Sequence, residues 1–187
     1  MTAVVLRIPS VRLSVVLFVF LALAFGPTAR AADATPATLA MLGFELLEDH
    51  PDPGRHDAQQ ARLKMIEDEF RVQIGQRGLY ALVDNAPHQA LIERVRSGVE
   101  FLYRCPHCVE EIGAGMGTRY VAVGWVQKVS NLILNVNIEI REVASNRVAL
   151  VKSVDMRGNN DQSWIRAIRF LVRDMDDKRK ANPRYGL

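Results

Sequence analysis

The sequence predicts an α/β (α+β) sandwich, a mixed β-sheet with helices packed on it, in the order β-α-β-α-β-β-β-α. Three observations lead to this fold class. Two short apolar runs flank a segment of helical periodicity, as in a strand–helix–strand crossover. Three consecutive segments between residues 120 and 156 have the residue pattern of strands. A final segment again shows helical periodicity, so helices should cover the sheet.

Residues 1–31 have the pattern of a secretory signal peptide. Leu13–Phe25 is an apolar run with one Ser, and at ~1.5 Å per residue it covers about 20 Å, less than the ~30 Å of a hydrocarbon core. Ala29-Arg30-Ala31 is a small-x-small cleavage site. We therefore expect cleavage after Ala31 and a periplasmic protein with no membrane segment after cleavage. An uncleaved membrane anchor is the alternative.

The composition is that of a globular protein without a basic surface. The formal charge of +3 equals the three arginines of residues 1–31, a segment without acidic residues. The remaining chain is neutral, so no nucleic-acid partner is expected. With 49% apolar and 24% charged residues, the chain is neither disordered nor a disulfide-dense scaffold. We expect a linker at 32–38, a single α/β domain at 39–175 and a mobile tail at 176–187.

The amino-terminal part of the domain predicts a strand, a helix and a second strand. Leu39–Leu47 is a compact apolar run, and Asp49–Asp57, with two Pro and one Gly, is a loop. The helix that follows ends near Gly75 or Gly78, and its apolar face holds Leu63, Ile66, Phe70 and Ile74. Leu79–Val83 is the second strand. Because a crossover helix joins them, the two strands should be parallel.

The carboxyl-terminal part predicts three antiparallel strands between helices. Tyr120–Val129 is apolar on both faces, as in a central strand, whereas Leu132–Ile140 alternates apolar and polar residues, as in a half-exposed strand. The other expected elements are a helix at Gln89–Arg96, a turn or helix from Cys108 to Gly117, a strand at Val148–Met156, and a helix capped by Gly158–Asp161 with Trp164, Ile168, Leu171 and Met175 on its apolar stripe.

The sharpest local motif is Cys105-Pro106-His107-Cys108. A helix amino terminus and a neighbouring His can lower the pKa of the first thiol, and the same four residues occur in exported thiol oxidases of the thioredoxin fold. That fold also needs a cis Pro at a later strand, and the only later Pro here, Pro183, lies in the tail. We therefore expect a structural disulfide between Cys105 and Cys108, with thiol–disulfide exchange as the alternative.

Other cofactor chemistry finds little support in the sequence. Val109 follows the second Cys, which excludes c-type haem attachment, and a zinc site at the motif lacks a second ligand pair. The Asp49–Asp57 loop could bind a divalent ion, with a solvated loop as the alternative; its candidate ligands are Asp49, His50, Asp52, His56 and Asp57. The sequence also lacks the G-x-S-x-G, H-E-x-x-H and phosphate-loop motifs. It favours a binding protein over an enzyme and predicts no cofactor.

Two polar surfaces are candidates for binding a protein partner. Asn is a poor strand former, so several Asn on one strand suggest a polar face with a function. This candidate face contains Trp125, Gln127, Lys128, Asn131, Asn135 and Asn137. The second surface is the polar side of the final helix, with Arg166, Arg169 and Arg173. Plain solvated faces are the alternative for both.

Three strings carry a resemblance to a known family: Leu42-Gly43-Phe44-Glu45-Leu46-Leu47, Gly124-Trp125-Val126-Gln127-Lys128-Val129-Ser130-Asn131, and Arg157-Gly158-Asn159-Asn160-Asp161-Gln162-Ser163-Trp164. They resemble the uncharacterised exported bacterial proteins of domain of unknown function 3280. The resemblance implies an accessory role beside quinoprotein (PQQ-dependent) alcohol dehydrogenases, which are often encoded next to these proteins. It brings no catalytic residues. The fold is also loosely similar to the amino-terminal domain of the Tol-system propeller protein and to the curli-export lipoprotein, which serve binding and assembly.

Overall fold

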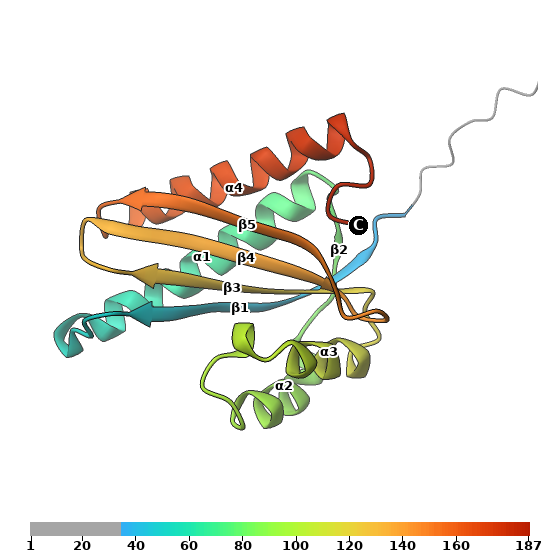
Figure 1. The fold of residues 1–187 in the computed structure, drawn as a ribbon, viewed down its shortest axis with the longest axis horizontal. Helices are drawn as coiled ribbons and strands as arrows, with labels where there is room; N and C mark the ends of the chain where they lie inside the picture. Colours follow the sequence, from blue (N-terminus) through green and yellow to red (C-terminus); the bar gives the residue numbers. More distant parts are fainter. Residues whose placement is uncertain (1–34) are drawn as a thin grey trace, which may run out of the picture. The chain divides into compact units, whose positions relative to one another are not determined.

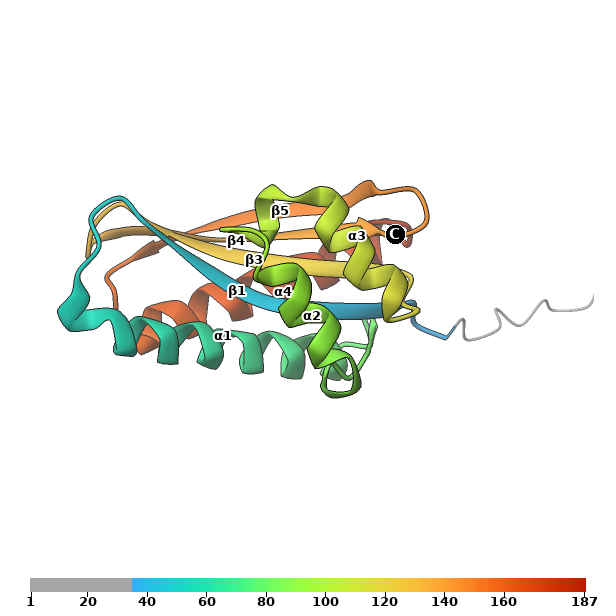
Figure 2. The same cartoon turned by 90° about the horizontal axis from the view of Figure 1, so that it is seen from below.

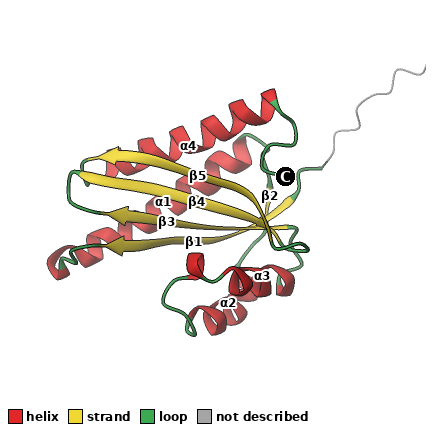
Figure 3. Cartoon of the chain, viewed as in Figure 1, coloured by secondary structure: helices red, strands yellow, loops and turns green. Residues whose placement is uncertain are grey.

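A computed structural model describes residues 35–187 of the chain, so the predicted signal peptide at 1–31 lies outside the described residues. The described part is built on one five-stranded mixed sheet in the order β2-β1-β3-β4-β5 (Figure 1 and Figure 3). Its strands are β1 (Thr38–Glu48), β2 (Ala81–Leu82), β3 (Tyr120–Lys128), β4 (Ile133–Glu142) and β5 (Arg147–Arg157). Strand β1 pairs in parallel with β2 and β3, and β3, β4 and β5 are antiparallel. The predicted sheet is confirmed.

Helices cover both faces of the sheet. The α-helices are α1 (His56–Gln76), α2 (Gln89–Arg96), α3 (Pro106–Gly115) and α4 (Asp161–Ala181), with 3-10 turns η1 (Pro53–Arg55), η2 (Ala86–His88) and η3 (Leu102–Arg104). Helices α1 and α4 lie on one face, and the shorter α2 and α3 lie on the other (Figure 1 and Figure 2). The predicted α/β sandwich is thus correct.

The end of α1 shows how local sequence shapes the crossover. Gly78 has a φ of +61°, a left-handed conformation that glycine adopts without a steric penalty. The N–H of Leu79 donates to the Ile74 carbonyl, and that of Gly78 donates to the Gly75 carbonyl, which is a Schellman arrangement. The chain then reverses into β2. This second strand is shorter than predicted, two residues rather than five.

Two apolar clusters fill the space between the layers. The larger one packs α1 and α4 against all five strands, with Trp164 fully buried at its centre. The indole Nε1–H of Trp164 donates to Oδ1 of Asn159 at 3.1 Å, so this polar atom is satisfied inside the core. The smaller cluster packs α2 and α3 against only β1 and β3. Strands β4 and β5 therefore have a helix-covered face toward α4 and an opposite face that α2 and α3 leave open.

The carboxyl terminus differs from the mobile tail predicted at 176–187. Helix α4 continues to Ala181, and Tyr185 and Leu187 pack against the larger cluster. The Tyr80 hydroxyl donates to the carbonyl of Gly186, and Arg179 donates to that hydroxyl at 3.0 Å. Burial raises the pKa of Tyr80 to about 12. The prediction failed because these contacts are long-range and leave no periodic pattern in the sequence.

Ion pairs along α4 lead to a prediction about acid stability. The pKa of Asp174 is lowered, chiefly by a hydrogen bond from Lys152 of β5, and the pKa of Asp176 is lowered, chiefly by Lys180. A carboxylate with a lowered folded-state pKa stabilises the fold above its unfolded-state pKa, which is about 4. That stability is lost as pH falls through the folded-state value. We therefore expect the free energy of unfolding to fall below about pH 4.

The Lys152–Asp174 pair gives this prediction a specific test. Lys152→Met should flatten the decrease in unfolding free energy between pH 4 and pH 2, measured by urea denaturation. Lys64→Met is the control, because Lys64 pairs with Asp68 on the exposed face of α1 and surface pairs of this kind contribute little. An identical pH dependence in the Lys152 variant and the unmodified chain would contradict the assigned role of the pair.

Candidate binding site at the disulfide and the open sheet face

The candidate site is the sheet surface that α2 and α3 leave uncovered. We call it the open face: Trp125, Gln127, Ile133, Asn135, Asn137, Glu139, Arg141, Val151, Ser153, Asp155 and Arg157. Trp125 pairs with Asn137 and Gln127 pairs with Asn135 in the β3–β4 register. Asn137 Nδ2 donates to Oδ1 of Asn135. The predicted amide surface is therefore real for these four residues.

An aromatic platform borders the open face. The ring of Tyr103 stacks on Trp125 with centroids 4.6 Å apart and planes 18° apart, and Phe101 lies 5.7 Å from Tyr103. The guanidinium of Arg104 lies over both Phe101 and Tyr103 at 5.2 and 5.3 Å. Partly buried aromatic rings next to an arginine are the residue types that dominate binding energy at protein interfaces.

Glu45 of β1 holds this platform in place. Its two carboxylate oxygens accept hydrogen bonds from the backbone N–H groups of Leu102 and Tyr103, at 2.8 and 3.2 Å. Glu45 is buried and faces the same side of the sheet as Trp125, with which it pairs across β1 and β3. Sequence reasoning missed Glu45 and Tyr103. The cluster of aromatic residues just before Cys105 was the available signal.

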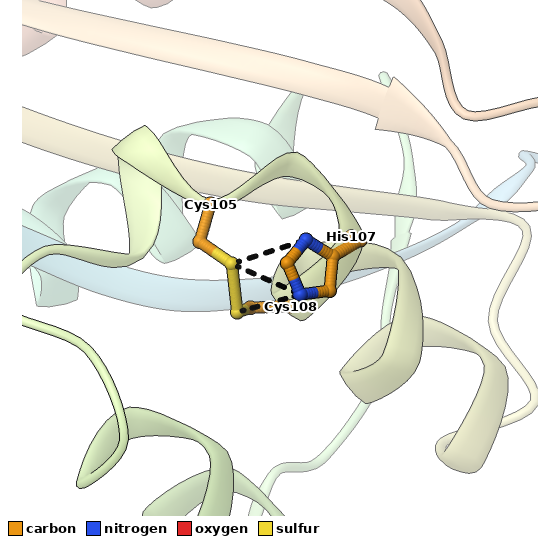
Figure 4. A group of neighbouring side chains, drawn as sticks. All are labelled: Cys105, His107 and Cys108. Carbon is orange, nitrogen blue, oxygen red and sulfur yellow. Dashed lines mark hydrogen bonds between the residues drawn. A yellow bond between two sulfur atoms is a disulfide. The ribbon is translucent and has the colours of Figure 1, made fainter.

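The disulfide adjoins the platform. Cys105 and Cys108 are bonded, as predicted, with their Cα atoms 5.2 Å apart, and they lie at the amino terminus of α3. The His107 ring faces the sulfur atoms: its Nδ1 lies 3.5 Å from Sγ of Cys105, and its Nε2 lies 3.8 Å from Sγ of Cys108 (Figure 4). His107 is exposed, whereas Cys108 is buried. The motif therefore presents an imidazole and one sulfur side toward the surface.

The surroundings of the disulfide differ from those of a thioredoxin-fold oxidase. The 3-10 turn η3 precedes the motif, not a strand, and an antiparallel β3–β4–β5 meander follows it. Residues 35–187 contain no cis peptide bond. The disulfide thus fixes the η3–α3 loop, and on the chain-entropy model closing so small a ring contributes only about 2 kcal/mol.

Lys128 is not part of the open face, which corrects its assignment to a partner-binding surface. Its side chain points to the α1/α4 side of the sheet, is only 5% exposed, and its Nζ lies 2.7 Å from Oε1 of Glu48. The error arose because Lys128 follows Gln127 directly, and successive residues of a strand point to opposite faces. Asn131 is exposed in the β3–β4 turn, where Asn159 donates a hydrogen bond to it. It lies beside the open face rather than on it.

The three predicted arginines of α4 are exposed but have different surroundings. Arg169 binds Glu69 of α1, with Nε 2.7 Å from Oε1, and this contact raises the pKa of Arg169. It therefore joins two helices. Arg166 lines a hollow between α4 and β5, and the guanidinium of Arg173 lies 5.4 Å from the ring centroid of Phe170. These last two form no ion pair within residues 35–187.

The five candidate metal ligands of the β1–α1 connection are not drawn together. Asp52 instead accepts a hydrogen bond from the Gly54 N–H and caps the turn η1, and α1 begins at His56. In the described part of the chain, one group of three or more metal-binding side chains lies within 4.8 Å of one another, and it is Cys105, His107 and Cys108. Asp49, His50 and Asp57 remain on the loop and the first turn of α1.

The fold and the site define a class of protein: a small α/β protein with helices on both faces of a mixed sheet and an aromatic, amide-rich surface. The chain belongs to the family DUF3280, described as "Protein of unknown function (DUF2380)", whose model matches residues 37–175. The family resemblance predicted from the three strings is thereby confirmed. No curated protein matches the sequence. Within residues 35–187, no helix is long and apolar enough to cross a membrane.

Several solved structures share the fold at low sequence identity. Lipoprotein GNA1162 from Neisseria meningitidis is 12% identical with a TM-score of 0.51, and the match covers 76% of this chain and 99% of that one. The LpoB C-terminal domain from Salmonella enterica is 12% identical (TM-score 0.41; 67% and 87% covered). TolB from Acinetobacter baumannii is 9% identical (TM-score 0.44; 80% and 30% covered), which agrees with the predicted loose similarity to the Tol-system propeller protein.

Proposed function

We propose that this chain is a periplasmic accessory protein that binds another protein through its open face. The observation that carries the proposal is the Tyr103–Trp125 platform beside a sheet surface that no described helix covers. Such a surface combines rigid aromatic area with amide hydrogen-bonding groups and little net charge, a combination that suits protein recognition. The apolar run and cleavage site of residues 1–31 support export.

The finer proposal concerns the partner. The family resemblance implies a place beside PQQ-dependent alcohol oxidation, so we propose a quinoprotein alcohol dehydrogenase, or a protein that acts with it, as the partner. The accessory protein would contribute contact surface rather than redox chemistry.

Trp125 provides the test of this proposal. We expect Trp125→Ala to weaken binding to a purified quinoprotein alcohol dehydrogenase from the same cells at least tenfold, because truncating a central aromatic residue typically costs 2 kcal/mol or more. Isothermal titration calorimetry measures the affinity. Val72→Ala is the control, since Val72 is also an exposed apolar residue but lies on α1. Binding unaffected by Trp125→Ala would refute the open face as the contact, and no binding by the unmodified chain would refute the dehydrogenase as the partner.

Thiol–disulfide exchange is the second candidate, and the contact between His107 and both sulfur atoms favours it. In this reaction a partner dithiol attacks the Cys105–Cys108 disulfide. Two electrons and two protons pass to this chain, leaving a partner disulfide and two cysteine thiols. A helix amino terminus and an imidazolium both stabilise the departing thiolate.

The redox proposal is tested by the properties of the cysteine pair. Exchange as a function predicts a reduction potential above about −200 mV and a Cys105 thiol pKa well below its usual value, with His107→Ala raising that pKa. A potential below about −300 mV together with an ordinary thiol pKa would leave the disulfide a purely structural role.

A further inference from the structure

We propose that the free edge of β5 and the outer face of α4 bind an extended, acidic segment of a partner protein, which pairs with β5 as a sixth strand. The inference goes beyond the proposed function, because it concerns the sheet edge farthest from Trp125. Strand β5 is eleven residues long and pairs only with β4 among the described strands. Alternate residues of such an edge strand direct their N–H and C=O groups away from the sheet, where another strand can pair with them.

The edge of β5 lies beside a hollow that would hold the side chains of an added strand. This hollow, of about 430 Å³, is formed by Val154–Arg157 of β5 together with Arg166, Ala167 and Phe170 of α4. A second hollow of about 530 Å³ shares Asp155, Met156 and Arg157 with it and extends to the start of β4. Helix α4 therefore provides a floor along the edge, so a sixth strand would be covered on one side.

The apolar residues around this edge are unusually exposed. Leu132 and Ile133 are 74% and 62% exposed at the start of β4, and Phe170 is 48% exposed on α4. All three border the two hollows. An extended segment in the hollows would cover large apolar side chains that the described chain leaves in water, which favours association.

The charges of the edge select the chemistry of the segment. Arg157 and Arg166 line the first hollow, and Arg173 lies over Phe170. Asp155 is the one acidic residue that lines the hollows, so three arginines face one carboxylate in this region. The surplus positive charge favours a segment with acidic residues at positions that face α4.

Two other occupants are less compatible with these charges. A second copy paired antiparallel about Lys152 would place Arg147 opposite Arg157, and like charges directly opposite are unfavourable in a sheet. An anionic lipid surface would meet Asp155 and would leave the outward backbone groups of β5 unpaired. Only a peptide chain uses both the arginines and the free backbone groups.

The test uses the purified full chain and a fluorescent octapeptide of alternating Glu and Val as the probe. We expect fluorescence anisotropy to detect binding that is at least fivefold weaker for the matching Lys–Val octapeptide and for a Glu–Val peptide N-methylated at alternate residues. Arg166→Glu should weaken binding at least fivefold, and Arg184→Glu, the same charge change on an exposed residue past α4, should not. Trp125→Ala should leave peptide binding unchanged, so this result and that for the open face are distinguishable.

Three outcomes would overturn the proposal. Equal binding of the Glu–Val and Lys–Val peptides would remove the charge argument, and equal binding of the N-methylated peptide would remove strand pairing. Concentration-dependent dimers in analytical ultracentrifugation that Arg166→Glu abolishes would assign the edge to a second copy. Binding to phosphatidylglycerol vesicles in the absence of peptide binding would assign it to a membrane surface. Thermal denaturation of Arg166→Glu verifies that the variant is folded.

Discussion

Gly124→Ala is expected to lower the free energy of unfolding by about 2–3 kcal/mol, because the centre of the sheet has no room for a methyl group at this position. A Cβ atom on Gly124 would lie 2.2 Å from Cδ1 and 2.3 Å from Cε1 of the Phe44 ring. That ring is buried and packs edge-to-face on Phe70, with centroids 6.2 Å apart. Either the ring or the β1–β3 pairing must shift. Urea denaturation measures the loss.

Two further variants separate this clash from a general effect of replacing glycine. Gly75→Ala should stabilise the chain by about 0.5–1 kcal/mol, since nothing lies within 4 Å of the added Cβ and the backbone there is helical. Phe44→Leu should restore part of the stability lost in Gly124→Ala, because it removes the ring that meets the methyl group. A Gly124→Ala variant as stable as the unmodified chain would contradict this account of the β1–β3 contact.

Glu48→Gln is expected to cost about 3–5 kcal/mol, because it leaves the Lys128 ammonium buried without a counter-charge. The side chains of Lys128 and Glu48 are only 5% and 10% exposed, and they join the ends of β1 and β3 on the α1/α4 side. Water cannot replace the lost carboxylate at this depth. The free energy of unfolding at neutral pH is again the measurement.

The double variant Glu48→Gln/Lys128→Met tests the reason for this loss. Removing both charges should recover most of the stability lost in Glu48→Gln, since a buried pair contributes little net energy relative to neutral residues of similar size. Arg94→Met is the exposed control: Arg94 pairs with Glu111 at the surface, and its replacement should change stability by less than about 1 kcal/mol. A loss below 1 kcal/mol in Glu48→Gln would show that the pair is solvated.

Much of the fold was predictable because periodic patterns report local burial. The alternation of Leu134, Val136 and Ile138 with polar residues predicts which side of β4 faces the core, and both clusters agree with it. The β-bulge between Met41 and Phe44 was not predictable. It depends on Gly43 at a φ of +91° and on long-range donors, since Arg71 and Asn85 both donate to the Met41 carbonyl.

The candidate site was predictable only in part, for the same physical reason. The amide residues of β4 and their neighbour Trp125 were found from composition and strand pattern, and the disulfide was found from cysteine spacing. The stacking of Tyr103 on Trp125 and the hydrogen bonds of Glu45 to η3 join segments more than 20 residues apart. Single-sequence patterns carry no information on such contacts, which is also why Lys128 was assigned to the wrong face.

Site-specific photocrosslinking in cells tests the central claim most directly. A benzophenone amino acid at Asn135, on the open face, should give one discrete adduct, and the same adduct should disappear when Trp125 is also changed to Ala. The same probe at Lys64, whose side chain is 77% exposed on α1, should not give it. A cell that yields the adduct from Lys64 but not from Asn135, or an Asn135 adduct that persists without Trp125, would contradict recognition through the open face.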